Sequence, residues 1–166
     1  MPAPTPTPTQ TPTALNTPAS TPTPAPTPTP VETGGSFTFT DWQEQPVGPA
    51  DVTPRLAHAS VTNAFTGGIV AAATSCDYTL AYTAQSAGTY TGLELLSGSL
   101  DGREGTFVLE ERGSFDADGT RCRFEVVPGS GTGELTGLTG SGGFTFRHGD
   151  TEVAYTFTYA LGAGQA

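Results

Sequence analysis

The segment at residues 126–148, VVPGSGTGELTGLTGSGGFTFRH, decides the fold that this sequence can adopt. It contains seven of the chain's 22 glycines, and Leu135, Leu138 and Phe144 are among its apolar residues. Because a glycine costs about 0.5–1 kcal/mol of backbone entropy inside a strand or helix, we expect turns here rather than regular structure. The turns lie between a strand that ends at Val127 and one that starts near Phe144. Tight reversals of this kind are typical of the corner of a closed β-barrel, where kinks and bulges relieve strain.

The remainder of the domain shows the two-residue period of β-strands. Residues 36–42, SFTFTDW, alternate between the two faces of a strand, and the glycines at 67–68 and the DADG sequence at 116–119 are hairpin signals. Eight such strands with short turns and no helix predict an all-β fold, an eight-stranded antiparallel β-barrel with room for one small ligand. The expected strands cover about residues 36–42, 57–66, 69–82, 89–97, 106–115, 120–127, 143–147 and 152–159.

The first 35 residues differ in composition from the rest of the chain. Eleven of the 15 prolines lie before Val31, and most of them alternate with threonine. Such a run has little apolar surface to bury and no backbone donor at each proline, so we expect an extended, disordered spacer. The sequence thus divides into a Thr/Pro-rich linker or tail at 1–35, a β-barrel domain at 36–161 and a disordered C-terminus at 162–166.

The charge balance excludes some classes of partner. Sixteen acidic residues oppose six arginines, there is no lysine, and the formal net charge is −10. Such a surface repels phosphate backbones and anionic lipids, and no stretch is apolar enough for a membrane helix, so we expect neither nucleic-acid binding nor membrane insertion. No signal peptide is visible, but Thr/Pro-rich spacers favour an exported or cell-envelope location over the cytoplasm. The sequence leaves open whether the domain forms a homo-oligomer.

Six short motifs carry a family resemblance: VVPGSGTGEL at 126–135, GGF at 142–144, HG at 148–149, GLE at 92–94, GREGTFVL at 102–109 and GSF at 113–115. Together they resemble a bacterial family known as domain of unknown function 3224, and the resemblance spans residues 37–159. It implies the allene oxide cyclase-like barrel, an eight-stranded antiparallel barrel that is similar to that of plant dirigent proteins. The family brings no established catalytic residues to this chain.

The usual signatures of phosphate and metal sites are missing from the sequence. The GSGTG sequence at 129–133 is followed by neither a lysine nor a helix, so we interpret it as turn geometry rather than a phosphate loop. His58 and His148 are the only histidines and have no ligand spacing around them. Asp116 and Asp118 lack the rest of a calcium loop. We therefore expect no metal and no cofactor.

The two cysteines, Cys76 and Cys122, share strand faces with Tyr78 and Phe124, so both can point the same way relative to the barrel wall. In an up-and-down order their strands are not neighbours, whereas a disulfide requires Cα atoms within about 7 Å of each other. Two interpretations stay open. One is a pair of buried free thiols, and the other is a disulfide between Cys76 and Cys122, which an exported protein would favour.

Glu94 is the candidate for a catalytic residue or ligand anchor. An inward position, on a face shared with Tyr90 and Leu96, would raise its pKa by desolvation, whereas an outward position would make it an ordinary solvated carboxylate. Glu111 and Arg123 lie on the two arms of one hairpin and either serve the same cavity or, as we expect, form a cross-strand salt bridge on the outer wall. The remaining ligand-binding candidates are aromatic residues expected to point inward: Tyr78, Tyr82, Phe107 and Phe144.

Three functions are compatible with these observations. The first, which we favour, is a small-molecule-binding β-barrel with an apolar cavity. The second is a cofactor-independent isomerase or cyclase of the allene oxide cyclase type, in which one carboxylate steers an apolar substrate held in a dry cavity. The third is a cell-envelope interaction module on the Thr/Pro spacer. Because no nucleophile, base and oxyanion site assemble in the sequence, it leaves open whether the protein is an enzyme.

Overall fold

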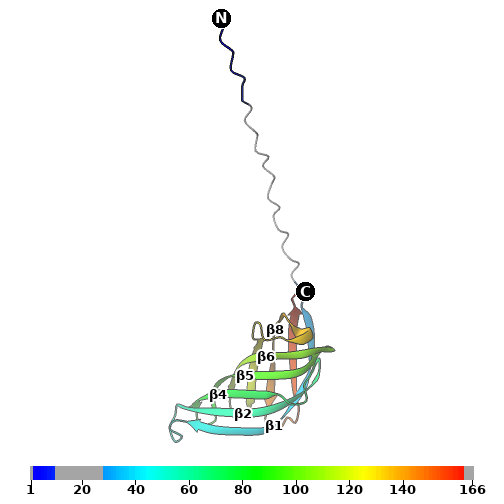
Figure 1. The fold of residues 1–166 in the computed structure, drawn as a ribbon. Helices are drawn as coiled ribbons and strands as arrows, with labels where there is room; N and C mark the ends of the chain where they lie inside the picture. Colours follow the sequence, from blue (N-terminus) through cyan, green and yellow to red (C-terminus); the bar gives the residue numbers. More distant parts are fainter. Residues whose placement is uncertain (1, 10–27, 163–166) are drawn as a thin grey trace.

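The computed structural model of the chain describes residues 2–9 and 28–162. Within them the chain forms nine β-strands and one short 3-10 helix, and the long strands curve round into a ring (Figure 1). In chain order the elements are β1 (Val31–Val47), β2 (Arg55–Gly67), β3 (Ile69–Val70), β4 (Ser75–Ala84), β5 (Ala87–Leu100), β6 (Arg103–Phe115), β7 (Gly119–Val126), η1 (Gly133–Leu135), β8 (Leu138–Arg147) and β9 (Val153–Leu161).

The eight long strands form a closed antiparallel barrel. Their order is β1-β2-β4-β5-β6-β7-β8-β9, and β9 pairs with β1 to close the ring. The closing pair runs from Val31 opposite Tyr159 to Phe37 opposite Val153. The two-residue β3 is an addition that pairs with the end of β5. The prediction of an all-β, eight-stranded antiparallel barrel is confirmed.

The first strand is longer than the sequence pattern predicted. It begins at Val31 because residues 31–33 already pair with β9. Pairing with β9 ends at Phe37, but pairing with β2 continues to Val47, with a shift of register between Thr40 and Gln43. The second half of β1 therefore extends beyond its β9 neighbour.

The first half of the glycine-rich segment turns, as expected from the sequence. β7 ends at Val126, and the chain then turns through η1, where Gly133 has a φ of 60°. This is the left-handed region, which glycine enters without the steric cost that a Cβ atom would bring. Leu135 and Leu138 are fully buried on either side of the next turn, so they anchor this turn in the core, as expected.

The second half of the segment is a strand, and the expectation of a turn there is wrong. β8 begins at Leu138 rather than near Phe144. Gly142 lies inside β8, where a Cβ atom would meet the carbonyl oxygen of Thr156 and approach the Phe124 ring to 2.6 Å. Glycine at this position makes room for close neighbours rather than for a bend, which is its other common role in a strand.

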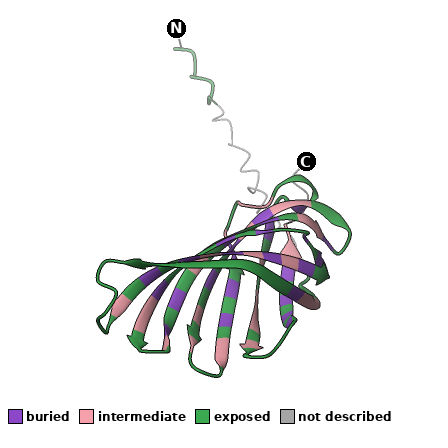
Figure 2. Cartoon of the chain, turned by 90° about the horizontal axis from the view of Figure 1, so that it is seen from below, coloured by how far each residue is buried: buried purple, intermediate pink, exposed green. Residues whose placement is uncertain are grey.

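Side chains alternate between the interior and the outer wall, as the bands of buried and exposed residues in Figure 2 show. The larger group of buried residues, here called the apolar plug, lies mainly at the end of the barrel where β1 begins and β9 ends. It includes Leu135 of η1 and the stacked rings of Phe107 and Phe157, whose centroids lie 6.4 Å apart. A smaller group of buried residues lies toward the other end and includes Cys76, Tyr78, Tyr90 and Cys122.

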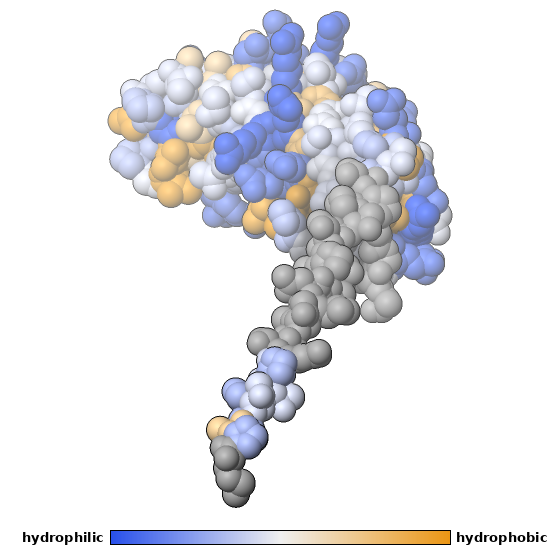
Figure 3. Space-filling model, turned by 90° about the horizontal axis from the view of Figure 1, so that it is seen from above, coloured by the Kyte–Doolittle hydropathy of each residue, from blue (hydrophilic) through white to orange (hydrophobic). Residues whose placement is uncertain are grey.

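The outer surface is mixed in polarity. On the face seen in Figure 3, hydrophilic residues predominate and hydrophobic residues form separate patches. Leu93 and Leu95 are about half exposed on the outer wall of β5, so Glu94 between them points into the barrel. Among the described residues there is no helix with the length and apolar character needed to cross a membrane.

Candidate ligand site

Two carboxylates lie inside the barrel. Glu94 on β5 and Glu111 on β6 are each only 1% exposed. Glu94 pairs with Leu109 and Gly92 with Glu111, so the two acids are diagonal neighbours on the inner face of adjacent strands. A carboxylate oxygen of each acid and the Cys76 sulfur all lie within 4.8 Å of one another. Buried acids of this kind are rare because a buried charge is costly unless it is paired or hydrogen-bonded.

Neutral donors hold Glu94. Its Oε2 accepts a hydrogen bond from Asn63 Nδ2 at 2.7 Å and another from Thr74 Oγ1 at 2.5 Å. Thr74 Oγ1 in turn accepts a hydrogen bond from the Asn63 backbone N–H at 3.1 Å. Asn63 and Thr74 are themselves buried. Within the described part of the chain, no cation takes part in this network.

Glu111 accepts hydrogen bonds from three weakly acidic groups. The Tyr78 hydroxyl donates to Oε2 at 3.2 Å, and the Cys76 thiol donates to the same oxygen at 3.4 Å. The Cys122 thiol donates to Oε1 at 3.7 Å. The donors come from β4 and β7, so Glu111 lies at the centre of a polar layer that crosses the barrel interior.

Burial raises the pKa of both carboxyl groups. For Glu111, loss of hydration is the largest cause, the charge of Glu94 adds to it, and the pKa rises to about 8. Loss of hydration also raises the pKa of Glu94, against the opposing effect of the hydrogen bonds from Thr74 and Asn63. Because the two acids are close and desolvated, the pair retains a proton near neutral pH.

An open cavity of about 370 Å³ lies at the end of the barrel opposite the apolar plug. Tyr82 near the end of β4, Asp116 after β6 and His148 after β8 mark its mouth. Half of the lining residues are aromatic, and they make up nine of the chain's 15 aromatic residues. These nine are Phe37, Phe39, Trp42, Tyr78, Tyr82, Tyr90, Phe115, Phe144 and Phe146.

Asn63 and Tyr78 connect this cavity with the two buried acids. Both side chains line the cavity, and each also donates a hydrogen bond to one of the acids beneath it. The Tyr78 ring packs edge-on against Tyr90, with centroids 5.0 Å apart, and is tilted against Trp42 at 6.3 Å. A molecule in the cavity would therefore contact groups that are one hydrogen bond away from Glu94 and Glu111.

The structure brings together five of the residues singled out from the sequence. Tyr78, Tyr82 and Phe144 line the cavity. Glu94 and Glu111 point inward and lie beneath it, which resolves the question of the direction in which Glu94 points. The side chains that could act on a ligand thus come from β4, β5, β6 and β8.

Phe107 and Arg123, by contrast, do not belong to this site. Phe107 lies in the apolar plug because it stands near the start of β6, at the closed end of the barrel. Arg123 is exposed on the outer wall of β7, opposite Arg112 in register. The expected cross-strand salt bridge between Glu111 and Arg123 is wrong, because Glu111 pairs with Phe124 and both of those side chains point inward.

The two cysteines are buried free thiols in the structure. Their strands, β4 and β7, are not neighbours in the barrel. Each thiol contacts a different oxygen of Glu111 rather than the other sulfur. Burial is the largest cause of the raised pKa of both Cys76 and Cys122, so both thiols stay protonated near neutral pH.

The sequence reasoning missed the contribution of β1 to the cavity. Strict alternation places Trp42 on the opposite face from Phe37 and Phe39. The register shift after Thr40, with Asp41 at a φ of 59°, brings all three aromatic side chains to the cavity. One feature of the sequence could have predicted this bulge. Asp41, a residue type that is tolerated in the left-handed region, interrupts an otherwise regular strand pattern.

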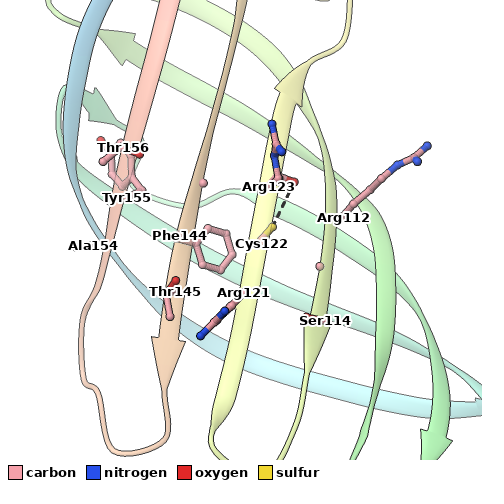
Figure 4. A pocket seen from close by; sticks show the side chains of 12 residues that line it. Arg112, Ser114, Arg121, Cys122, Arg123, Phe144, Thr145, Ala154, Tyr155 and Thr156 are labelled. Carbon is pink, nitrogen blue, oxygen red and sulfur yellow. Dashed lines mark hydrogen bonds between the residues drawn. The ribbon is translucent and has the colours of Figure 1, made fainter.

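A larger hollow of about 710 Å³ lies on the outer wall of β6 to β9. Figure 4 shows Arg112, Arg121 and Arg123 pointing in different directions from β6 and β7. Arg112 Nη2 lies 3.3 Å from Glu110 Oε1 in a solvent-exposed ion pair. Because these side chains are exposed and do not converge on one point, we place the candidate site in the inner cavity.

Comparisons with known proteins agree with this architecture. A solved structure of a protein of unknown function from the DUF3224 family of Shewanella oneidensis MR-1 is 25% identical to this chain and superposes with a TM-score of 0.68. The match covers 82% of this chain and 100% of that one. No curated protein matches the sequence. The model of the family described as protein of unknown function (DUF3224) matches residues 33–159, and the chain therefore belongs to this family.

Proposed function

We propose that this domain binds a small, largely apolar molecule in the cavity at the open end of its barrel. The observation that carries the proposal is a cavity of about 370 Å³, rich in aromatic residues, in which two polar lining residues, Asn63 and Tyr78, donate hydrogen bonds to two buried carboxylates. Small-molecule sites have this composition, an apolar lining with a few fixed polar groups, and begin at about 300 Å³. The cavity lies near the lower end of that range, which favours a compact ligand.

The polar layer supports binding rather than folding. Replacement of buried polar groups by well-packed apolar residues often leaves stability unchanged or raises it, so a barrel gains little stability from two acids and two thiols in its interior. The buried acids and thiols instead hold Tyr78 and Asn63 in place at the base of the cavity, where both can contact a ligand. Groups with shifted pKa values also cluster at functional sites.

A second function, a cofactor-independent isomerase or cyclase, is favoured by one further observation. The Tyr78 hydroxyl lies between the cavity and Glu111, a carboxyl group with a pKa of about 8, at 3.2 Å from Oε2. A general acid or base with a pKa near the working pH is efficient in proton transfer. In this proposal Glu111 accepts or supplies a proton through Tyr78, and the resemblance to the allene oxide cyclase barrel fits such a reaction.

Titration with an environment-sensitive apolar dye tests the binding function. We expect saturable binding with one dye per chain, and we expect Trp42→Ala to weaken it, since Trp42 lines the mouth and is about half exposed. Leu93→Ala on the outer wall is the matched control and should leave the dye affinity unchanged. Equal binding to wild type and both variants would show that the dye adheres to the outer surface and would contradict the proposal.

A further inference from the structure

We propose that the ligand of this cavity carries a positive charge, as a compact ammonium or quaternary ammonium compound with an apolar body. The inference rests on the proposed binding function and adds the chemical class of the ligand. Three features of the described residues support it: the aromatic rings of the lining, the sign of the charges around the mouth, and a cation that already lies on one of the rings.

The first feature is the aromatic wall. The face of an aromatic ring carries negative electrostatic potential and attracts a cation within about 6 Å, most strongly when the ring belongs to tryptophan. Trp42 and Tyr78 are tilted against each other at a centroid distance of 6.3 Å, and Tyr78 is edge-on to Tyr90. The three rings all belong to the cavity lining and are not parallel to one another. Cages of this kind are used to recognise quaternary ammonium groups.

The second feature is the charge of the lining. Glu44 and Asp116 line the mouth, whereas none of the six arginines, all of which lie in the described residues, is part of the lining. Glu44 Oε2 accepts a hydrogen bond from the Tyr82 hydroxyl at 2.6 Å, so this carboxylate is held beside the aromatic wall. The chain has no lysine and a net charge of −10. An anionic ligand would therefore enter without a basic partner and against repulsion.

The third feature is Arg55. Its Cζ lies 3.6 Å from the centroid of the Tyr82 ring, which is a cation–π contact made by the protein itself. Tyr82 also packs edge-on against Phe115, with centroids 5.0 Å apart. One aromatic residue of the cavity lining thus already stacks against a cation.

The buried acids extend this preference for cations into the barrel. Glu94 and Glu111 lie below Tyr78 and Asn63 and share a proton near neutral pH, and water does not screen the remaining negative charge of the pair as it does at the surface. A cation above Tyr78 would favour the ionised form of this pair, and an anion would oppose it. The charges at the mouth and below the cavity therefore act in the same direction on a ligand.

Two ligands of the same shape test the inference. We use the para-hydroxyphenyl-trimethylammonium cation and para-tert-butylphenol, in which a carbon replaces the charged nitrogen, together with para-hydroxybenzenesulfonate as the anion. Calorimetric titration of the full chain near neutral pH should show that the cation binds about ten-fold or more tightly than the neutral compound. The reason is that several aromatic rings and the carboxylates of Glu44 and Asp116 act on the positive charge. The sulfonate should not bind measurably.

The outcomes separate the two proposals. If the neutral compound binds as tightly as the cation or more tightly, the charge preference is wrong while the binding function stands. If the sulfonate binds better than the cation, the charge preference is also wrong. If neither the aromatic compounds nor the apolar dye bind, the binding function itself is wrong.

Substitution at Trp42 locates the effect. Trp42→Phe keeps a ring face, whereas Trp42→Leu keeps apolar volume without one. We expect Trp42→Leu to reduce the affinity for the cation several-fold more than that for the neutral compound, and Trp42→Phe to restore most of the difference. Because Trp42 is about half exposed, both variants should fold, which unchanged melting temperatures will verify. Equal losses for both ligands in both variants would contradict a role of the ring in binding the charge.

Discussion

Glu94 and Glu111 hold carboxylate oxygens within 4.8 Å of each other inside the barrel, and burial is the main cause of the raised pKa of each. A carboxyl group whose pKa is higher in the folded than in the unfolded chain contributes stability at low pH and loses it as the pH rises. For Glu111 this window runs from about 4.5 to about 8. We therefore expect the melting temperature to fall between about pH 5 and pH 8.

Glu111→Gln should flatten this pH dependence, because glutamine has a similar shape and does not ionise. The variant should melt at a higher temperature than wild type at pH 8 and differ little from it at pH 5. Glu110→Gln is the matched control, since Glu110 is the neighbouring residue on the outer face of β6 and about half exposed. Thermal unfolding across this pH range checks the prediction, and identical slopes for wild type and Glu111→Gln would contradict it.

Gly133 and Gly129 separate the cost of backbone conformation from the cost of a close contact. Both have positive φ, 60° and 81°, but only at Gly133 would a Cβ atom approach a neighbour, the Glu104 carbonyl oxygen at 2.9 Å. We expect Gly129→Ala to cost about 1 kcal/mol of unfolding free energy, and Gly133→Ala to cost clearly more. Gly133→Val should be the most destabilising. Denaturant titration measures all three, and equal costs for the two alanine variants would show that the contact at Gly133 relaxes.

Substitution of Phe107 should affect stability alone, and substitution of Trp42 should affect ligand binding alone. Phe107 is 2% exposed in the apolar plug, so Phe107→Leu should lower the unfolding free energy by about 1–3 kcal/mol and leave dye affinity unchanged. Trp42→Leu should lower the dye affinity and leave the unfolding free energy unchanged. Paired denaturant and dye titrations measure both quantities. A loss of dye binding in a folded Phe107→Leu protein would show that the plug and the cavity are linked.

The effect of an N-terminal truncation on stability should depend on whether it removes the first residues of β1. Residues 31–33 pair with β9, and Thr33 Oγ1 donates a hydrogen bond to Asp101 Oδ1 at 3.1 Å. Removal of residues 1–29 should leave the melting temperature unchanged, as expected for a Thr/Pro-rich spacer. Removal of residues 1–35 should lower it by several degrees, because it leaves the end of β9 paired on one side only, with β8. Differential scanning calorimetry of both proteins checks this, and equal melting temperatures would mean that the first residues of β1 add no stability.

Much of the fold could be predicted from local pattern, because alternation and turn residues act within a few positions of each other. The sequence does not determine whether Glu94 points inward, because both faces of its strand carry leucine, at Leu96 on one side and at Leu93 and Leu95 on the other. Depth along the barrel could not be predicted either. Phe107 and Phe144 both point inward, yet one lies in the plug and the other at the cavity, because depth depends on how far each strand is shifted against its neighbours.

The pairing of Val31 with Tyr159 has a practical consequence for how the protein can be handled. The polypeptide enters and leaves the barrel side by side at the plugged end, whereas Asp116 and His148 stand at the open end. A sensor chip, bead or fusion partner joined ahead of Val31 or after Leu161 would therefore lie at the plugged end of the barrel and leave the mouth of the cavity open to solution. Immobilisation through either terminus should preserve ligand access, whereas attachment through the turn at 116–119 should obstruct it.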